Sequence, residues 1–269
     1  MQQQVHVGCS GWSYAAWAGP FYPRGMEQTK WLQHYASIFD FVEIDSTFYS
    51  IPSPFRVKKW SVNTPAGFRF TAKMPKVITH EKAMSDSLRE LELFYSALTP
   101  LKDKVLAFLI QLPPSISFKG GFRAMQNFVA TLDKRYRYAI EVRQPSWFHE
   151  EFYQFLKKEE ICLVWNQLDV ISAPAVVTTD FVYLRFIGDR SIQDHEFGTI
   201  QKDRTQEMQN WATELNKVSA SLSFSVVAQN NHYAGFGPAS VNIFRRILGL
   251  PELQFAGEKA QSKLSEFGI

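Results

Sequence analysis

The stretch Phe41-Val-Glu-Ile-Asp-Ser-Thr-Phe-Tyr-Ser-Ile-Pro52 decides the fold. Its apolar residues alternate with Glu43 and Asp45, so a strand here places both carboxylates on one face. A half-buried strand would leave such a face in water. The strand-like runs before and after this one, however, are apolar on both faces until they end in a charged or amide residue. This recurrence predicts a closed parallel barrel whose polar residues gather at one mouth, the carboxyl ends of the strands.

Strand-like runs and segments of helical periodicity alternate along most of the chain. Such an alternation is what a (β/α)8 barrel requires, because neighbouring parallel strands need crossover connections. The expected strands begin near residue 5 and then cover 41–45, 68–73, 105–110, 138–143, 161–165, 181–186 and 224–228. The expected helices cover 27–39, 54–60, 85–98, 122–132, a segment ending near 158, 205–218 and a last one ending near 248. The predicted fold class is α/β, a TIM-like barrel with irregular βα loops at the carboxyl mouth.

Length and composition fit one domain of this kind. The chain has 269 residues, close to the about 250 that are typical of such a barrel. Its 45% hydrophobic content, with 15% aromatic residues, can fill a large core. We therefore expect a single domain over 1–269, with 251–269 as a polar C-terminal extension. A signal peptide and an apolar run of membrane-spanning length are not apparent, so we expect a cytoplasmic protein without membrane association.

The charge and the cysteines narrow the function classes. A formal net charge of +3 permits an anionic ligand, but the chain lacks the dense Lys/Arg block of a dedicated nucleic-acid arm. Cys9 and Cys162 lie in apolar strand-like runs without Cys-x-x-Cys spacing, which is typical of reduced core thiols.

Short motifs run through the chain in a consistent order. They are Gly8-Cys-Ser-Gly-Trp12, Phe21-Tyr-Pro23, Val42-Glu-Ile-Asp-Ser-Thr-Phe-Tyr49, Trp60, Gly67-Phe-Arg-Phe70, Thr79-His-Glu81, Gln111-Leu-Pro-Pro114, Glu141-Val-Arg143, Ser146-Trp147 and Asn230-Asn231. Through these motifs the chain resembles the YecE-like family, a domain of unknown function with a TIM-barrel-like fold, over about residues 5–250. The resemblance implies the barrel and leaves the activity open.

The chain departs from the family pattern at two places. The family often has Arg-x-His-Gly at the end of the seventh strand, whereas this chain has Arg185-Phe-Ile-Gly188. A histidine-dependent role at position 187 is therefore excluded. Many relatives carry an acid after the sixth strand, where this chain has Asn166 and only later Asp169. This weakens any mechanism that needs a carboxylate at that point.

The strand alternation brings polar side chains to the carboxyl mouth, where the active sites of this fold lie. Buried charges are costly unless they are paired, so we expect the carboxylates to meet the lysine and the arginines. The set could be a structural ion-pair layer that plugs the barrel, but its size favours a functional site. Its members are Glu43, Asp45, Lys73, Gln111, Glu141, Arg143, Asn166, Arg185, Asn230 and Asn231.

The first functional hypothesis is an enzyme, a hydrolase or a lyase or isomerase, that acts on a phosphorylated or otherwise anionic compound, nucleic acid included. Lys73, Arg143 and Arg185 would hold the anion, because arginine matches the geometry of phosphate oxygens. Further substrate contacts would come from amides, histidines and exposed aromatic residues near the mouth. These are Gln111, Asn230, Asn231, His80, His232, Trp12, Tyr14, Phe48 and Tyr49.

The catalytic groups of this hypothesis are carboxylates. Glu43 or Glu141 would act as general acid or base, with Asp45 beside them and the neighbouring cations setting the pKa. No cofactor is predicted, although one of these three carboxylates could bind a single divalent metal ion.

Two other functions stay open. A glycoside-hydrolase-like enzyme would use Glu43 and Glu141 as its acid and base pair, although the nearby cations would keep both carboxylates ionised. A non-catalytic protein would use the same basic pocket to bind a metabolite without turnover.

Overall fold

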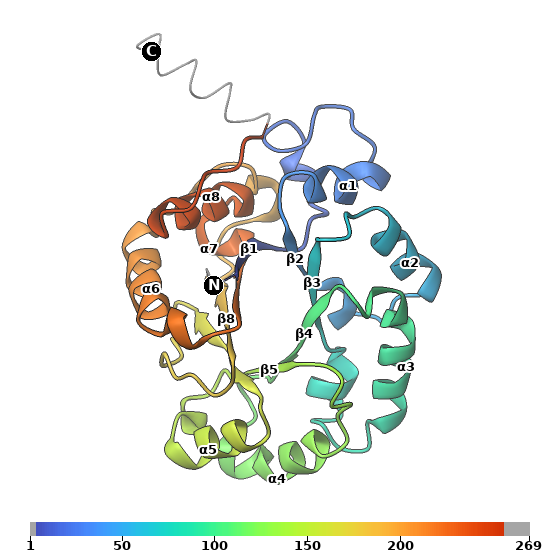
Figure 1. Ribbon diagram of the computed structural model, residues 1–269, viewed down its shortest axis with the longest axis vertical. Coiled ribbons are helices and arrows are strands. Elements are labelled where there is room, and N and C mark those ends of the chain that lie inside the picture. Colours follow the sequence, from blue (N-terminus) through green and yellow to red (C-terminus); the bar gives the residue numbers. More distant parts are fainter. Residues whose placement is uncertain (1–3, 256–269) are drawn as a thin grey trace.

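The structure is a computed structural model that describes residues 4–255 of the chain. Its strands are β1 (Gln4–Ser10), β2 (Phe41–Ile44), β3 (Arg69–Lys73), β4 (Val105–Gln111), β5 (Tyr138–Glu141), β6 (Cys162–Leu163), β7 (Trp165–Gln167), β8 (Phe181–Phe186) and β9 (Phe224–Gln229). All pairings are parallel, and the sheet order is β6-β5-β4-β3-β2-β1-β9-β8-β7. The two ends of this order are adjacent in the chain, so the sheet curls into a nearly closed barrel (Figure 1). The predicted α/β TIM-like barrel is confirmed.

β6 and β7 together make the sixth strand expected from the sequence, which is interrupted at Val164. β6 pairs with β5, where Cys162 lies opposite Ala139, whereas β7 pairs with β8, where Asn166 lies opposite Arg185. One stretch of chain therefore changes partners along its length, and this change closes the barrel.

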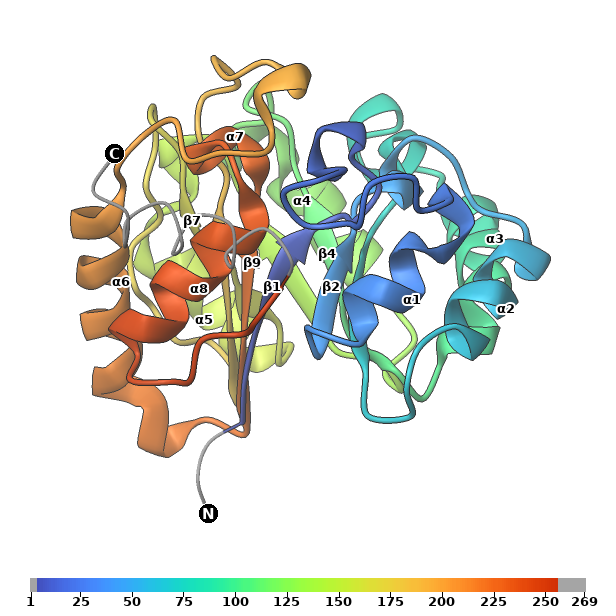
Figure 2. The ribbon, with the colours of Figure 1, turned by 90° about the horizontal axis from the view of Figure 1, so that it is seen from above.

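Helices surround the barrel on its outside (Figures 1 and 2). They are α1 (Trp31–Ala36), α2 (Pro54–Val62), α3 (Leu88–Leu98), α4 (Phe118–Val129), α5 (Glu150–Lys158), α6 (Thr205–Val218), α7 (Asn231–Ala234) and α8 (Gly237–Ile247). Ser53 caps α2 as expected: its side chain accepts a hydrogen bond from the Arg56 amide at 3.3 Å, and Pro54 occupies the first turn.

Some helix predictions were wrong in extent. The helix expected over 27–39 is α-helical only in α1, because beyond it the backbone tightens to i→i+3 bonds such as Ile38 N to Tyr35 O at 3.1 Å. α4 begins before residue 122, because the Ser117 hydroxyl accepts from the Gly120 amide at 3.2 Å and starts the helix there. A π-helix (Val77–Glu81) and the short α7 were not predicted.

The barrel interior and the layer between barrel and helices are two separate buried clusters. The interior cluster comes from alternate strand positions. Near the amino ends it includes Phe41, Phe181 and Phe224, and the last two rings stack at 4.9 Å between centroids. Toward the carboxyl ends the same inward positions become polar but stay buried, at Glu43, Thr71, Gln111, Glu141, Asn166 and Arg185. The alternation read from the sequence therefore positions the site.

Three further expectations concern the rest of the chain. Cys9 and Cys162 are free and buried, as predicted. Over residues 4–255, no helix has the length and apolar character needed to cross a bilayer. The expected extension 251–269 lies outside the described residues from 256 onward, whereas Phe255 packs edge-on against Phe21 at 5.3 Å.

Candidate active site at the carboxyl mouth of the barrel

A pocket of about 340 Å³ lies at the carboxyl ends of the strands. Loops that follow β1, β2, β5, β8 and β9 build its wall, and the strand ends of β3 and β8 supply its floor. The lining residues are Gly11, Trp12, Ser13, Tyr14, Asp45, Ser46, Tyr49, Lys73, Arg143, Arg185, Ile187, Arg190, Asp194, Phe197, Asn230 and His232. The pocket is thus at the end of the barrel where this fold carries its active sites.

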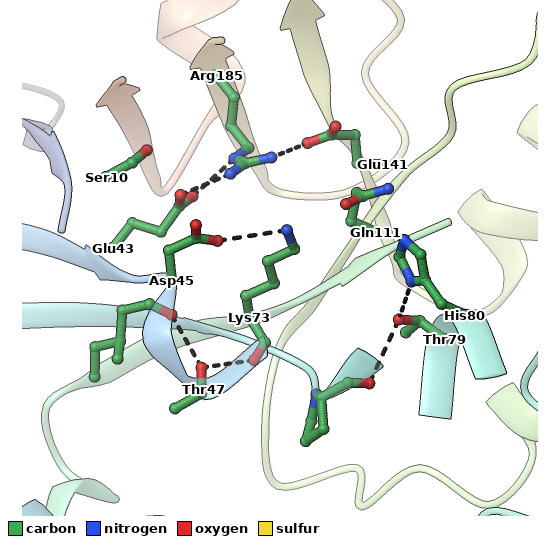
Figure 3. Close-up of polar contacts among 12 residues, drawn as sticks. Ser10, Glu43, Asp45, Thr47, Lys73, Thr79, His80, Gln111, Glu141 and Arg185 are labelled. Carbon is green, nitrogen blue, oxygen red and sulfur yellow. Dashed lines mark hydrogen bonds and ion pairs between the residues drawn. The ribbon is translucent and has the colours of Figure 1, made fainter. Parts of the chain in front are cut away.

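Arg185 is the buried centre of the site and bridges two carboxylates (Figure 3). Its Nε and Nη2 donate to the two carboxylate oxygens of Glu43 at 2.8 and 2.7 Å, and its Nη1 donates to Glu141 Oε2. Both glutamates are fully buried, and the arginine is 2% exposed. Burial alone would lower the pKa of the guanidinium, but the two carboxylates outweigh it and raise that pKa well above its usual value.

Tyr183 and Thr71 hold Glu43 from the side of the barrel interior. The Tyr183 hydroxyl donates to Glu43 Oε2 and lies 2.6 Å from Thr71 Oγ1. An ionised carboxylate can only accept, so the tyrosine proton points to Glu43 and the threonine donates to the tyrosine. Burial, and then the charge of Glu43, raise the pKa of Tyr183 well above its usual value. Glu43 therefore receives three hydrogen bonds and is fixed in place.

Both carboxylate oxygens of Glu141 also accept hydrogen bonds. Oε1 accepts from Arg143 Nε at 2.6 Å, and Oε2 accepts from Arg185. Burial would raise the pKa of Glu141, but the two guanidinium groups outweigh it and lower that pKa to about 2. Glu141 is consequently an anion at neutral pH and has no proton to give.

Lys73 is paired much more loosely than the arginines. Its Nζ lies 3.4 Å from Asp45 Oδ1 (Figure 3). The same nitrogen lies 3.8 Å from the centroid of the Phe48 ring. Within residues 4–255, the amine donates no hydrogen bond, and Asp45 Oδ1 accepts none. Burial lowers the pKa of Lys73; Asp45 opposes this, and Arg185 lowers that pKa further. Glu43 and Glu141 were expected to meet Lys73, Arg143 or Arg185; they meet the two arginines, while Lys73 meets Asp45.

The amides expected at the mouth have mainly structural contacts. Gln111 donates to the next backbone carbonyl at 2.6 Å, and Asn166 donates to the carbonyl of Val142 at 3.3 Å. Neither lines the pocket. Asn230 does line it, and its side-chain oxygen accepts from the His232 amide at 3.0 Å, which caps α7.

Asn231 was expected beside Asn230 in the site, and the structure places it outside the pocket instead. It is 1% exposed. Its side-chain oxygen accepts from Trp17 Nε1 at 3.1 Å and from the Gly237 amide at 2.9 Å. Asn231 therefore connects the loop after β1 to the start of α8 and supports the wall of the pocket.

The two histidines expected at the mouth take different places. His232 lines the pocket, and its Nδ1 lies 3.0 Å from a backbone carbonyl. His80 lies in the π-helix outside the lining, with Nδ1 2.8 Å from Thr79 Oγ1 and its ring edge-on to Phe48 at 4.9 Å. Burial lowers the pKa of both histidines, and nearby cations lower that of His80 further.

The aromatic residues at the mouth are less exposed than expected. Tyr49 is 63% exposed and lines the pocket. Trp12 and Tyr14 also line it but are half-buried, because Trp12 packs edge-on against another tryptophan at 5.6 Å and Tyr14 donates to a backbone carbonyl at 2.6 Å. Phe48 lies under the lysine amine and does not line the pocket. The prediction of four exposed stacking residues is corrected to one.

The segment after β8 contributes lining residues that the sequence did not point to: Ile187, Arg190, Asp194 and Phe197. This segment has no regular period, so alternation could not locate them. Gly188 lets it approach α7, since its φ is +78° and a Cβ there would lie 2.2 Å from the His232 carbonyl oxygen. Tyr183 was also missed, although its place two residues before Arg185 on the same face was a usable signal.

Most carboxylate oxygens of the site are already engaged and are not free to bind a metal ion. Within the described ranges, no group of three His, Cys, Asp or Glu side chains gathers as a metal site. The oxygens of Glu43 and Glu141 already accept hydrogen bonds from guanidinium or phenol groups. A single divalent ion at Glu43, Asp45 or Glu141 stays a prediction, and of the three carboxylates Asp45 has the fewest hydrogen bonds to lose.

Fold and pocket together define an α/β-barrel protein with a charged pocket at its carboxyl mouth. A family model described as "Protein of unknown function DUF72" matches residues 6–264, so the chain belongs to this family. UPF0759 protein YunF from Bacillus subtilis is 27% identical over an alignment that covers 94% of this chain and 96% of that protein. UPF0759 protein YecE from Escherichia coli is 28% identical over 144 residues. That match covers 54% of this chain and spans only 50% of YecE. The resemblance to the YecE-like family is confirmed.

Solved structures of the family share the barrel. A DUF72 family protein from Thermotoga maritima has a TM-score of 0.78 at 25% identity, covering 91% of this chain and 99% of that one. A DUF72 family protein from Enterococcus faecalis has a TM-score of 0.73 at 24% identity, covering 93% and 99%. These similarities show a shared fold, and a shared fold does not define the function.

Proposed function

We propose that the pocket is the active site of an enzyme that acts on a small anionic compound, such as a phosphate ester or a carboxylate. The observation that carries this proposal is the state of Arg143 and Arg190, which both line the pocket. Arg143 engages Glu141 through Nε alone. Within residues 4–255, the terminal nitrogens of Arg143 and the guanidinium of the exposed Arg190 donate no hydrogen bond. Unpaired guanidinium N–H groups beside a cavity suit bidentate binding of phosphate or carboxylate oxygens.

The charges at the pocket surface support the same conclusion. Glu43 and Glu141 are fully buried beneath it, and Arg185 and Arg143 together neutralise them. Lys73 and Arg190 remain at the pocket surface together with the terminal N–H groups of Arg143, so donors for an anion gather there even though the charges of the lining and of the two glutamates balance. The cationic lining residues are Lys73, Arg143, Arg185 and Arg190, and the acidic lining residues are Asp45 and Asp194.

Proton transfer in this proposal belongs to Lys73 and Asp45. Glu43 and Glu141, the expected acid and base, are held by guanidinium groups, and the lowered pKa of Glu141 leaves it without a proton. Lys73 and Asp45 touch the pocket and are weakly paired. Because its pKa is lowered, Lys73 exchanges its proton closer to neutral pH than an ordinary lysine does. A glycoside hydrolase with the glutamates as its acid and base pair loses support for the same reason.

The anion site is tested by thermal denaturation with inorganic phosphate and with a neutral sugar. We expect phosphate to raise the melting temperature of the wild type, because a ligand of the folded state stabilises it. Arg143→Ala and Arg190→Ala should each need at least about tenfold more phosphate for the same rise, since hydrogen bonds to charged groups contribute roughly 1.5–3 kcal/mol. Arg123→Ala, an exposed arginine on α4, is the matched control and should behave as the wild type.

Two results would contradict the proposal. One is a rise with the neutral sugar and none with phosphate. The other is a phosphate effect of equal size in all four proteins, which would mean that the anion binds elsewhere.

A further inference from the structure

We infer that Lys73 is a nucleophile that forms an imine with the carbonyl carbon of a small anionic ketone or aldehyde, while Asp45 moves the protons. The inference rests on the proposed function, because Arg143 and Arg190 would hold the anionic group of this substrate. It adds the substrate class, a carbonyl compound with a phosphate or carboxylate group, and a covalent step.

The fold presents the Lys73 amine to the pocket in a fixed position. Lys73 is the last residue of β3, and its backbone carbonyl accepts from Thr47 Oγ1 at 2.7 Å. Its side chain is 8% exposed, yet it lines the pocket and holds Nζ over the Phe48 ring. A nucleophile must be rigid and reach the substrate, and this lysine meets both conditions.

A half-buried lysine, Lys104, shows what a structural amine looks like in this protein. Lys104 Nζ donates to three oxygens, the carbonyls of Ser61 and Thr64 and the Thr64 hydroxyl, at 2.8, 2.8 and 2.9 Å. Over residues 4–255, the nearest polar partner recorded for Lys73 Nζ is Asp45 at 3.4 Å, and its other recorded contact is the face of the Phe48 ring. An amine that only filled space would be expected to have its protons satisfied as Lys104 does. Lys73 therefore keeps its nitrogen available for a bond to a ligand.

The surroundings also favour the reactive form of the amine. A neutral amine is the nucleophile, and burial lowers the pKa of Lys73, with Arg185 and Arg143 adding to the effect. Asp45 and Glu141 oppose these influences without cancelling them. The nearby Asp45 carboxylate is 29% exposed and can exchange protons with solvent.

The reaction balances without an oxidant, a reductant or a metal ion. The Nζ lone pair attacks the carbonyl carbon, the C=O π electrons move to oxygen, and one amine proton passes through Asp45 to that oxygen. The second amine proton then leaves with the hydroxyl group as water, and the C=N bond forms. A pocket of about 340 Å³ is at the lower end of the range of roughly 300–1,000 Å³ for ligand sites, which suits a small metabolite.

The test uses the full-length protein, sodium cyanoborohydride and two ketones that differ only in a phosphate group, dihydroxyacetone phosphate and dihydroxyacetone. Peptide mass spectrometry then measures reductive attachment at each lysine. We expect attachment of the phosphate compound at Lys73 to be at least about tenfold faster than at any other lysine, as for an amine with a lowered pKa. Lys73→Arg should abolish it, whereas Lys76→Arg and Lys104→Arg should leave it unchanged. Asp45→Asn should slow it while the fold stays intact.

The outcomes separate the inference from the proposed function. Attachment spread over surface lysines, or unchanged in Lys73→Arg, overturns the imine. If phosphate still raises the melting temperature of the wild type but not of Arg143→Ala, the anion site is supported although no imine forms. Attachment at Lys73 that is equally fast with both ketones, and unaffected by Arg143→Ala, supports the imine and overturns the anion site.

Discussion

Two sets of opposite charges share the mouth of this barrel and are built differently. In the first, Arg185 joins Glu43 and Glu141 through short hydrogen bonds, and Arg143 donates to the remaining carboxylate oxygen of Glu141. In the second, Lys73 and Asp45 meet at 3.4 Å without a hydrogen bond. Charges buried in a protein are stable only when they are fully paired. The first set can therefore hold the mouth together, whereas the second is free to act on a ligand.

Removing the central cation should have the largest effect on stability. Arg185→Met leaves buried Glu43 with only the Tyr183 hydroxyl and buried Glu141 with only Arg143, so we expect a loss of about 3–5 kcal/mol in the free energy of unfolding. Urea denaturation measures this loss, and Arg123→Met is the control. A loss below about 1 kcal/mol would mean that the bridge is not structurally required.

The next effect concerns acid stability. Because the pKa of Glu141 is lowered to about 2 in the folded protein, its stabilisation is present above its usual pKa and is lost as the pH falls toward 2. Between about pH 5 and about pH 3, the unfolding free energy of the wild type should fall by about 2 kcal/mol more than that of Glu141→Gln. Parallel pH profiles for the two proteins would show that another carboxylate dominates acid unfolding.

A smaller effect on the free energy of unfolding is expected when one hydrogen-bond donor to Glu43 is removed. Tyr183→Phe removes the phenol donor and leaves Thr71 without its acceptor, which should cost about 1–3 kcal/mol. The double variant with Thr71→Val should be less destabilised than the sum of the single changes, because the two hydroxyls form one chain. Additive losses in urea denaturation would argue against that chain.

The smallest stability effect should come from the loosely paired lysine. Lys73→Met removes the contact with Asp45 at 3.4 Å and the cation–ring contact with Phe48, but also a charge that burial disfavours, so the unfolding free energy should change by less than about 1 kcal/mol. The same change should abolish reductive attachment at this position. A large destabilisation would place Lys73 with the structural charges and remove the contrast between the two sets.

Alternation along the strands was enough to predict the barrel and its inner polar layer. Glu43, Glu141 and Arg185 occupy the inward positions that the period of two assigns to them, because a closed barrel forces every second residue inside. The pairing within that layer was only partly predictable. Sequence position does not say which carboxylate Lys73 meets.

The positions of the loop residues could not be predicted from the alternation along the strands. Arg190 and Asp194 lie in an irregular segment whose course depends on contacts with α7, which no local pattern encodes. Asn231 was misplaced because the short α7 turns it toward Trp17 rather than toward the pocket. The helix boundary near 118 was missed because a serine cap overrides two glycines in the first turns.

The amide of Asn231 also bears on how the chain is made. It accepts from Trp17 near the beginning of the chain and from Gly237 near the end, across 214 residues in the first case. A ribosome releases the loop after β1 long before it releases its partner, and domains acquire long-range contacts only once both segments exist. The pocket wall that contains Trp12 and Tyr14 is therefore among the last parts to assemble, so truncated chains would lack a finished mouth.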